Sequence, residues 1–556
     1  MGISRRSVLV SSLAAAGTGL GAAGLYTATA SEAASPPGDV VGKVTTGYQG
    51  WFAARGDGSP ANRWWHWDNN TNNPPSPADH FIKAWPDVRE LTTTFATGFA
   101  ALGNGQPANL FSSWTDQTID THVKWHQQYG IDTIALQRFA DEIPTRNGVA
   151  AKLRTAAEKY GRKYYIMYDI SGWTNFATGV PSDWTNAMAA HTASSAYARQ
   201  NGKPVVCIWG FGFPDRPGTA ADCLNVINFF KAQGCYVIGG VPREWRTNGA
   251  PGTKTGFTAV YDALNMISPW MVGAIGTIAD VDNAYNNLQV PDQAYCNARG
   301  IDFQPCVLPG DVVARQRRHG DFMWRQFYNV VRAGAQGIYI SMFDEYNEGN
   351  QIAKTAENAS MIPAGSGFLA LDEDGTACSA DYYLRLTGDG GRMLKGQLAL
   401  TATRPTPTIG GSTPTTAPVT PPVTPPTGTF SLRSRANSRY VTTGAAGTGQ
   451  LVASATAVGP SEQFTTVTVT GGVALRSVRS GRYVCAEGGG ASPLIANRTA
   501  ASAWETFTLI RNADGTVSLR AAANNLIVCA DNAGAAPLIA NRTAASTWEA
   551  FDMTTV

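Results

Sequence analysis

Apolar runs and helical patterns alternate along the chain up to about residue 400. Runs rich in β-branched and aromatic residues predict buried strands, at 44–52, 131–139, 163–170, 203–210, 235–241, 268–275, 302–308 and 337–345. Apolar residues recur with a helical period over 118–129, 148–160, 183–200, 222–233 and 322–333. Eight strands alternating with helices in roughly 360 residues predict an α/β fold, a (β/α)8 TIM barrel. Residues from about 53 to 117 fit neither pattern, which predicts a loop-rich insertion after the first strand.

The C-terminal part of the chain repeats itself. The repeated segments are Pro493–Ser502 with Pro537–Ser546, and Trp504–Phe507 with Trp548–Phe551, each pair at an offset of 44. A degenerate first copy begins near Ser431. Three copies of short strands, each of about 40 residues, predict an all-β domain of the β-trefoil type. We expect the repeated tryptophans and phenylalanines to be core residues rather than platforms for sugars.

Two segments of biased composition set the domain limits. Arg5 and Arg6 precede a weakly apolar, glycine-rich run followed by small residues, which predicts a twin-arginine signal peptide and export from a bacterium. A membrane anchor is the weaker alternative, because the run is short. Residues 401–428 are rich in proline and threonine, which predicts an extended linker. The expected division is a signal peptide at 1–35, the barrel at 36–400, the linker at 401–428 and the trefoil at 429–556.

Charge and composition narrow the classes of partner. Lys and Arg total 43 against 41 Asp and Glu, so no bulk charge points to nucleic acid, and we expect none as a partner. Fifteen tryptophans fit a secreted protein that handles sugars, since pyranose faces stack on indole. The eight cysteines match no zinc pattern. An exported protein can pair them, and Cys223 with Cys235 and Cys296 with Cys306 are the close candidates.

Three carboxylates follow the last predicted strand: Asp344, Glu345 and Glu348. Crowded carboxylates at the end of a buried strand are unfavourable unless they are hydrogen-bonded, paired or used. Barrel enzymes place their active sites at these strand ends, where other polar and aromatic side chains also gather. With Asp344, the substrate-binding candidates are Tyr48, Trp51, His66, Gln137, Arg138, Tyr168, Asp169, Trp209, Arg243, Glu244 and Asn347. Arg138, Arg243 and Glu244 fit structural ion pairs equally well.

A pocket lined by tryptophan and tyrosine with several carboxylates fits glycoside hydrolysis. That reaction needs a protonated acid at the leaving oxygen and a second carboxylate that assists at the sugar ring. Glu345 and Glu348 are three residues apart, so a turn can direct both toward one pocket, with Glu348 further out. Neighbouring carboxylates raise one another's pKa, which keeps one of them protonated.

The segment Phe343–Ile352 resembles the Glu-x-x-Glu-Gly segment of glycoside hydrolase family 99 and its relatives in family 71. Phe322–Asn329 and Trp125–Phe139 are similar to bacterial members described as xylosidase/arabinosidase-like, and the resemblance covers most of 40–397. It implies a retaining, endo-acting α-mannosidase or α-mannanase. Glu348 would be the acid/base at the glycosidic oxygen. Glu345 would take the proton of the sugar 2-hydroxyl, which attacks the anomeric carbon to give a 1,2-anhydro intermediate.

The chain departs from that pattern beside the acids. Tyr346-Asn347 and Asn350 stand where the best-known members carry Trp-His and Thr, which bears on mannan specificity. An α-1,3-glucanase, with Asp344 in the pair, and a xylosidase or arabinosidase are alternatives on the same barrel. A non-catalytic glycan-binding protein is the alternative from another class.

Cofactors and other partners follow from the same analysis. We expect no cofactor and no metal, because His122 and His126, four residues apart, lack a third ligand at a family spacing. The C-terminal copies resemble the fascin-like trefoils of secreted actinobacterial enzymes. The expected partners are a polysaccharide or oligosaccharide substrate and a glycan surface bound by the trefoil, with no membrane after signal removal.

Overall fold

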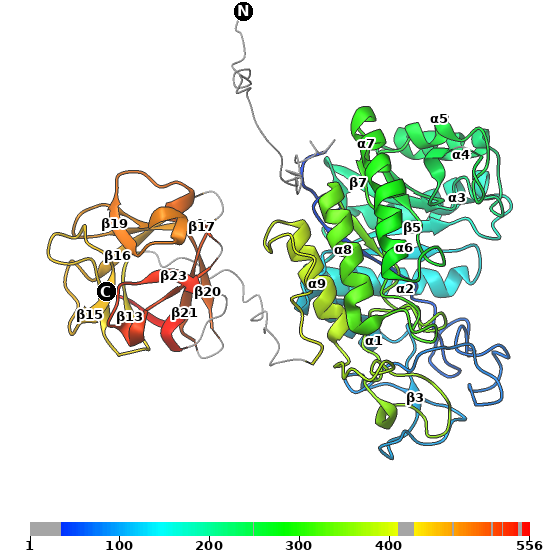
Figure 1. Ribbon diagram of the computed structural model, residues 1–556, viewed down its shortest axis with the longest axis horizontal. Helices are drawn as coiled ribbons and strands as arrows, with labels where there is room; N and C mark the ends of the chain where they lie inside the picture. The colour runs from blue at the N-terminus through cyan, green and yellow to red at the C-terminus, as the bar shows by residue number, and fades with distance from the viewer. Residues whose placement is uncertain are drawn as a thin grey trace, which may run out of the picture.

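The computed structural model describes residues 35–247, 249–409, 428–469, 472–512, 515–524, 526–542 and 547–556 (Figure 1). The predicted signal peptide lies outside these residues except for Ser35, as does most of the predicted linker. Within the described ranges, no helix has the length and apolar character needed to cross a membrane.

A parallel sheet forms the centre of the N-terminal body. Its order is β10-β9-β8-β7-β5-β4-β1-β12-β11, and each neighbouring pair is parallel. The strands are β1 (Val44–Tyr48), β4 (Thr133–Arg138), β5 (Lys163–Asp169), β7 (Lys203–Trp209), β8 (Tyr236–Val241), β9 (Met266–Pro269), β10 (Asp302–Phe303), β11 (Cys306–Val307) and β12 (Ile338–Ile340). The parallel α/β sheet that the sequence predicts is confirmed.

The two ends of this strand order belong to one short segment of chain. β10 pairs with β9, and β11, only two residues further on, pairs with β12. The backbone N–H of Gln304 donates to Ile267, and that of Tyr339 donates to the carbonyl of Pro305. Asp302–Val307 therefore joins β9 to β12.

Helices separate the strands and bury their outer faces. They are α1 (Asp116–Gln128), α2 (Ile143–Tyr160), α3 (Phe176–Asp183), α4 (Ala220–Ala232), α5 (Thr258–Asp262), α6 (Ile278–Ala284), α7 (Val290–Arg299), α8 (Asp321–Ala333) and α9 (Tyr382–Leu394). π-Helical turns follow α3 (Trp184–Met188) and α6 (Tyr285–Gln289), and 3-10 turns lie at Ala189–Ala193, Trp245–Thr247, Arg318–Gly320 and Ala359–Met361. Helices α6, α8 and α9 lie side by side (Figure 1). Because helices cover these strands, β4 and β8 are buried at every position.

Several predicted elements have different bounds, and the first strand, for example, ends at Tyr48 rather than 52. The sixth strand is Met266–Pro269 rather than 268–275, because a turn at 271–274 with Gly273 at a φ of 77° redirects the chain. Trp270 therefore follows this strand instead of lying near its start. The last strand ends at Ile340 rather than 345. The predicted helix over 183–200 is wrong at its end, where β6 (Arg199–Gln200) pairs with β7.

Residues 49–115 form the insertion after β1. All of them are described, and their only strands are β2 (Phe95–Ala96) and β3 (Asn109–Leu110). The insertion has a core of its own: Trp67 and Trp85 are buried, and the Trp67 indole donates to the Phe111 carbonyl at 2.9 Å. This loop-rich insertion is therefore packed around buried side chains of its own.

The first part of the predicted linker packs on the N-terminal body. Trp324 of α8 donates from Nε1 to the Thr401 carbonyl at 3.1 Å, and Arg404 contacts Asp321 at 2.8 Å. Arg385 of α9 donates to the Pro407 carbonyl at 2.8 Å. Residues 401–409 are thus attached to α8 and α9.

The C-terminal part is an antiparallel all-β body, as predicted. Six strands pair in a closed ring, and three hairpins complete the sheet. The ring contains β13 (Thr429–Ser434), β16 (Gln463–Val469), β17 (Gly472–Ser477), β20 (Thr506–Arg511), β21 (Val517–Ala521) and β24 (Phe551–Thr555). The hairpins are β14 (Tyr440–Thr442) with β15 (Val452–Ala455), β18 (Tyr483–Ala486) with β19 (Leu494–Arg498), and β22 (Ile527–Cys529) with β23 (Ile539–Arg542). Short 3-10 turns lie at Glu487–Gly490, Ala503–Glu505, Asn532–Gly534 and Thr547–Glu549.

Burial separates the repeated aromatic residues into two groups. Phe507 and Phe551 are fully buried, as predicted for core residues. The prediction is wrong for the repeated tryptophans, because Trp504 is 42% exposed and Trp548 is 38% exposed. Indole rings at these positions do not complete the core.

All eight cysteines are buried and free. The candidate pairs Cys223–Cys235 and Cys296–Cys306 are therefore not formed. Each of these thiols has a raised pKa because burial disfavours the thiolate.

Candidate functional site

The acidic segment lies in a compact loop directly after β12. The backbone N–H of Met342 donates to the Asn350 carbonyl at 3.0 Å, and that of Asn350 donates to the Glu345 carbonyl at 3.2 Å. Gly349 has a φ of 70°, which a residue with a side chain adopts only with strain. These contacts hold the loop as one turn that presents its carboxylates at the carboxyl end of the sheet.

Asp344 is the buried anchor of this turn. Its Oδ1 accepts from the backbone N–H of Gln49 at 2.7 Å and its Oδ2 accepts from that of Gly50 at 2.9 Å. Burial raises the pKa of Asp344 to about 7, and the two backbone donors oppose that rise. Asp344 thus fixes the chain just after β1 against the chain just after β12.

Glu345 is buried beside that anchor, with 6% of its surface exposed. Its Oε2 accepts from Gln49 Nε2 at 2.9 Å. Burial raises the pKa of Glu345 well above its ordinary value, and the negative charge of Glu348 adds to the rise. Glu345 is therefore a stronger base, when ionised, than a carboxylate in water.

Glu348 lies in a different environment, exposed at the edge of the loop. Lys83 and Asp311, which form an ion pair at 2.9 Å, flank the turn: a Cβ added at Gly349 would lie 3.3 Å from Lys83 and 3.1 Å from Asp311. Desolvation by surrounding protein raises the pKa of Glu348, Lys83 opposes the rise and Asp311 adds to it. One glutamate is thus enclosed and the other faces solvent.

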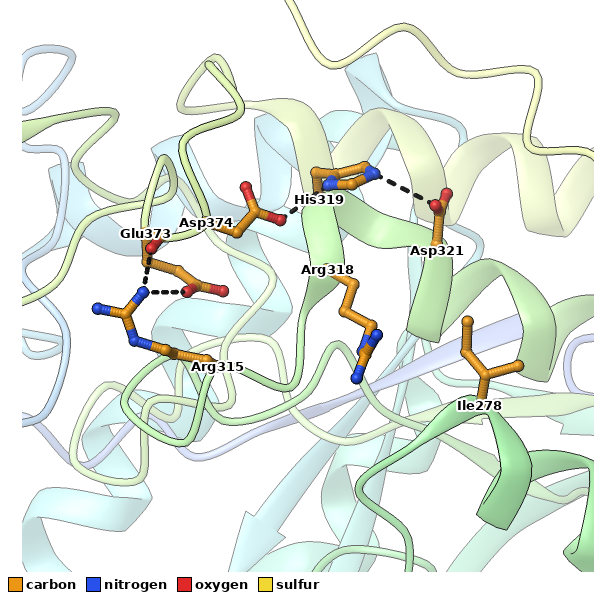
Figure 2. Close-up of a pocket in the computed structure, with 7 residues that line it drawn as sticks. All are labelled: Ile278, Arg315, Arg318, His319, Asp321, Glu373 and Asp374. Atoms are coloured by element: carbon orange, nitrogen blue, oxygen red, sulfur yellow. Dashed lines mark hydrogen bonds and ion pairs between the residues drawn. The ribbon is translucent and has the colours of Figure 1, made fainter.

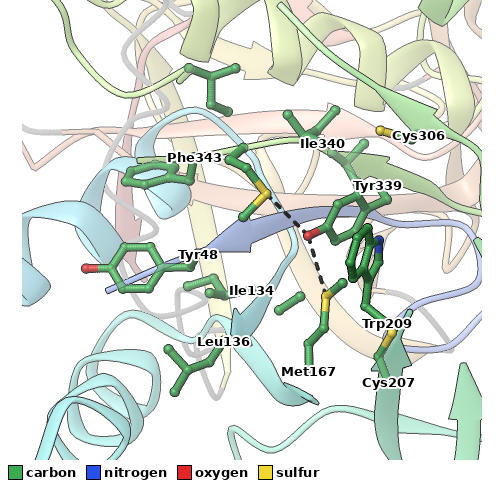
Figure 3. Close-up of a cluster of buried hydrophobic side chains, with 14 of the residues drawn as sticks. Tyr48, Ile134, Leu136, Met167, Cys207, Trp209, Cys306, Tyr339, Ile340 and Phe343 are labelled. Carbon is green, nitrogen blue, oxygen red and sulfur yellow. Dashed lines mark hydrogen bonds between the residues drawn. The ribbon is translucent and has the colours of Figure 1, made fainter. Parts of the chain in front are cut away.

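Beneath the acids, the sheet interior carries polar atoms. Gln137 donates from Nε2 to the Tyr339 hydroxyl at 3.2 Å, and that hydroxyl lies 3.5 Å from the sulfur of Met342. The same hydroxyl lies 3.5 Å from the sulfur of Met167 (Figure 3). Asp169 accepts from the backbone N–H of Ser171 at 2.8 Å. Burial raises the pKa of Asp169, and its charge contributes to the raised pKa of Glu345. Gln137 and Asp169 therefore lie with the acids.

Aromatic rings form two groups among the predicted site residues. Trp51 stacks on His66 with ring centroids 3.7 Å apart, and burial with nearby Arg146 and Arg63 lowers the pKa of His66 to about 3. Trp209 meets Trp270 edge-on at 5.2 Å. Within the described chain, the indole nitrogens of Trp51 and Trp209 are buried without a hydrogen-bond partner.

Amide groups beside the acids also have unused hydrogen-bonding capacity. Gln49 Oε1, Asn347 Oδ1 and both side-chain atoms of Asn350 are buried without a partner among the described residues. Buried polar atoms are usually paired, so unpaired atoms grouped beside carboxylates indicate a place where a polar ligand binds.

Other predicted substrate-binding residues have partners within the fold. Tyr48 hydrogen-bonds His122 of α1 at 3.0 Å. Arg138 forms a bidentate contact with Asp183 of α3, which also accepts from the Tyr168 hydroxyl at 2.8 Å. Arg243 and Glu244 form an ion pair with each other, and Arg243 donates to the Ala274 carbonyl. Of these residues Tyr48 lies against the acidic turn, because its ring centroid is 5.7 Å from that of Phe343 and the charge of Asp344 adds to the raised pKa of its hydroxyl.

His122 and His126 are buried between α1 and the sheet. His126 bonds Thr46 at 2.8 Å and the His122 carbonyl at 2.8 Å. Burial lowers the pKa of His122 to about 3 and that of His126 to about 4. Among the residues described, no three His, Cys, Asp or Glu side chains are placed to hold a metal.

Replacing His122 by phenylalanine is expected to reduce the loss in the free energy of unfolding that occurs as the pH falls below about 6.5. The folded pKa of His122 lies below its unfolded value of about 6.5, so the unfolded chain binds more protons and stability falls as pH decreases below about 6.5. Between pH 6.5 and 5 this histidine lowers the free energy of unfolding by about 2 kcal/mol. Urea unfolding at pH 6.5 and at pH 5 measures this change in the free energy of unfolding. His80→Phe, at a half-buried histidine in a loop, is the control. An equal loss in wild type and His122→Phe would contradict the assignment.

A separate pocket of about 360 Å³ lies beside the start of α8 (Figure 2). His319 bridges Asp374 at 2.7 Å and Asp321 at 3.2 Å, and Arg315 pairs with Glu373 at 3.3 Å. Its lining is Ile278, Arg315, Arg318, His319, Asp321, Glu373 and Asp374. None of the predicted site residues is in this lining.

Sequence reasoning missed Lys83 at the acidic turn. Lys83 comes from the insertion, which has no periodic pattern, and its backbone N–H donates to the Tyr346 carbonyl at 2.9 Å. Asp311, just after the seventh predicted strand, and Asn350, beside the acids, stand out in the sequence although neither is among the predicted site residues. No signal in the sequence placed Lys83.

Comparisons with known proteins give weak similarities. A family model described as a domain of unknown function (DUF7910) matches residues 467–555, and no curated protein matches the sequence. An endo-α-mannosidase of glycoside hydrolase family 99 from Bacteroides thetaiotaomicron is similar in structure at 16% identity and a TM-score of 0.47, covering 64% of this chain and 98% of that chain. A glycoside hydrolase-like protein is similar at 13% identity and a TM-score of 0.37, covering 64% and 95%. The designed three-fold symmetric protein ThreeFoil is similar at 16% identity and a TM-score of 0.22, covering 23% and 100%.

Proposed function

We propose that the protein is a secreted glycoside hydrolase that cleaves α-linked polysaccharide within the chain, with α-mannan as the favoured substrate. In this proposal residues 36–400 are a (β/α)8 barrel and 429–556 a β-trefoil. The unequal environments of the two glutamates carry the proposal: Glu345 is enclosed and held by Gln49, while Glu348, three residues on, is exposed. One carboxyl group can then act at the sugar ring and the other at the departing oxygen.

The reaction assigned to these residues has two steps. Glu345, ionised, takes the proton of the sugar 2-hydroxyl while that oxygen attacks the anomeric carbon. Glu348, protonated, gives its proton to the glycosidic oxygen, the bond to the leaving sugar breaks, and a 1,2-anhydro sugar remains. Water then attacks the anomeric carbon and gives a proton to Glu348, and Glu345 returns the proton to the 2-oxygen. Two displacements retain the anomeric configuration.

The resemblance of Phe343–Ile352 to families 99 and 71 supports an α-linked substrate. The unpartnered atoms of Gln49, Asn347 and Asn350 support a hydroxyl-rich one, since sugar hydroxyls both donate and accept. Tyr346 does not take part directly, because it is buried and its hydroxyl donates to the Lys354 carbonyl at 2.9 Å.

Incubating the full chain with yeast mannan, α-1,3-glucan, arabinan and arabinoxylan tests the proposal. We expect mannan to be cut internally into oligosaccharides whose reducing ends first appear as the α-anomer by proton NMR. First appearance of the β-anomer would overturn the two-step mechanism. Cleavage of α-1,3-glucan alone would replace the substrate, and cleavage of none would overturn the enzyme assignment.

A further inference from the structure

The exposed tryptophans of the C-terminal body occupy equivalent positions in two repeats. Trp504 and Trp548 lie 44 residues apart, and the phenylalanine three residues after each is fully buried. An indole left 38% or 42% exposed forgoes part of the hydrophobic free energy that full burial would provide, so these two rings do not serve mainly to fill the core.

Each tryptophan precedes a buried glutamate that lies near the arginine of a surface ion pair. Arg498 contacts Glu487 at 2.6 Å, and its Nε lies 3.8 Å from the buried Glu505, which follows Trp504. A Cβ added at Gly489 would lie 3.8 Å from the Trp504 ring, so the segment after Glu487 reaches the indole. The second group repeats this arrangement, with Arg542 contacting Asp531 at 2.9 Å and lying 3.8 Å from Glu549, beside Trp548.

The first repeat shows that the fold does not require this set. Tyr440 to Tyr483 and Phe464 to Phe507 both give an offset of 43, which aligns Gly444 with Glu487, Ala455 with Arg498 and Ser461 with Trp504. The core positions Leu451, Leu494 and Leu538 are fully buried in all three repeats. Glu462 of the first repeat aligns with Glu505, but Trp504, Arg498 and Glu487 have no counterpart there. Since the first repeat keeps the core without them, the tryptophan, the arginine and the acid that contacts it are additions to the surface of the other two repeats.

The tryptophan, arginine and carboxylate of each group indicate which class of ligand would bind there. An exposed indole offers a flat apolar face to a pyranose ring, and the adjoining arginine and carboxylate offer donors and acceptors to its hydroxyls. The acid neutralises the arginine, which disfavours a phosphate or sulfate group. We propose that Trp504 and Trp548 are the centres of two equivalent binding sites for a neutral polysaccharide. This function goes beyond catalysis and does not depend on the catalytic assignment.

Two sites on one body hold a polymer more tightly than either alone. After one site is occupied, the second meets its sugar at a high effective concentration, which can multiply the apparent affinity by about 10²–10⁴. Loss of one tryptophan should therefore weaken retention strongly, and loss of both should remove it.

The test uses the full chain with Trp504→Ser, Trp548→Ser and both together. Serine is the natural residue at the equivalent position 461, so these variants are expected to fold, which thermal unfolding checks. The probes are sedimentation with insoluble α-1,3-glucan and electrophoresis through gels containing yeast mannan, arabinan or arabinoxylan. Val478→Ala, at another exposed apolar residue of the same body, is the matched control.

We expect each single variant to lower apparent affinity for at least one probe about 10-fold or more and the double variant to lose the binding contributed by this body. Val478→Ala should bind as wild type, and all variants should keep wild-type turnover of a soluble oligosaccharide if the chain is an enzyme. Retention of the double variant equal to wild type would overturn the proposal, as would failure of wild type to bind any of the four polysaccharides. Neither result depends on turnover, so a failed catalytic assignment remains distinguishable.

Discussion

Replacing Glu348 by glutamine is expected to lower kcat on mannan by about 10³-fold or more, near the upper part of the range for loss of general acid–base catalysis. Glutamine keeps the length of the side chain but has no proton to give to the glycosidic oxygen. Because Glu348 is exposed at the loop edge, the substitution should leave the thermal unfolding midpoint unchanged. Initial rates on mannan measure the loss.

A glycosyl fluoride separates this role from a general loss of the site. Fluoride leaves without protonation, so the first step of Glu348→Gln should be much less impaired on that substrate. The decline of wild-type activity at high pH, where Glu348 loses its proton, should also disappear. Glu158→Gln, on α2 at an exposed position, is the matched control. Full activity of Glu348→Gln on every cleaved glycan would contradict the mechanism.

Replacing Asp344 by alanine is expected to destabilise the N-terminal body by about 2–6 kcal/mol, since each buried donor left without an acceptor loses about 1–3 kcal/mol. The two donors are the backbone N–H groups of Gln49 and Gly50. Activity should fall with stability because Gln49 also holds Glu345. Chemical denaturation and kcat, measured on the same preparation, report the two effects.

Asp344→Asn separates positioning from stability. Its amide presents a donor to one of the two backbone N–H groups, which displaces Gln49 and should lower kcat about 10-fold or more with little change in KM. Asp302→Asn is the control, because Asp302 is equally buried and accepts from the Ser35 N–H at 3.0 Å at the other end of the sheet. If Asp344→Asn and Asp302→Asn lowered kcat equally, Asp344 would have only a structural role and would not position the catalytic residues.

The pH dependence gives Asp344 a second signature. The folded pKa of Asp344, about 7, lies above the unfolded value of about 3.9, so the folded protein binds this proton more tightly than the unfolded chain does. The stabilisation of the folded state by this protonation is fully present below about pH 4 and is lost as the pH rises through about 7. Asp344→Asn should remove this decline. An unchanged slope between pH 4 and 7 would contradict the raised pKa.

The sequence predicts strands best where they are buried on both faces. β4, β5 and β8 each contain a run of apolar residues that is almost entirely buried, and their observed bounds lie within about two residues of the predictions. The prediction for β9 is displaced because the apolar run continues to Ile275, whereas the strand ends at Pro269 and Gly273 turns the chain within that run. The acids after β12 were identified because carboxylates are rare at a buried strand end.

Contacts between distant segments account for what the sequence did not predict. Asp344 and Gln49 follow the adjacent strands β12 and β1 although 295 residues separate them in the sequence, and Lys83 reaches the same turn from an insertion without periodicity. The prediction of core tryptophans in the C-terminal repeats was wrong because an offset of 44 does not show whether a repeated residue faces the core or solvent, and Trp504 and Trp548 lie in short 3-10 turns.

The attachment of residues 401–409 decides where the two bodies can be separated. A truncation at residue 400 would remove the acceptor of the Trp324 indole, the arginine that contacts Asp321 and the buried Thr406, whose hydroxyl donates to Asp389 at 2.7 Å. Such a fragment would expose the surfaces of α8 and α9 that these residues cover, and its lower solubility could be mistaken for a need for the C-terminal body. A fragment ending after residue 409 keeps that cover, so a loss of polymer degradation in it can be attributed to the missing binding sites.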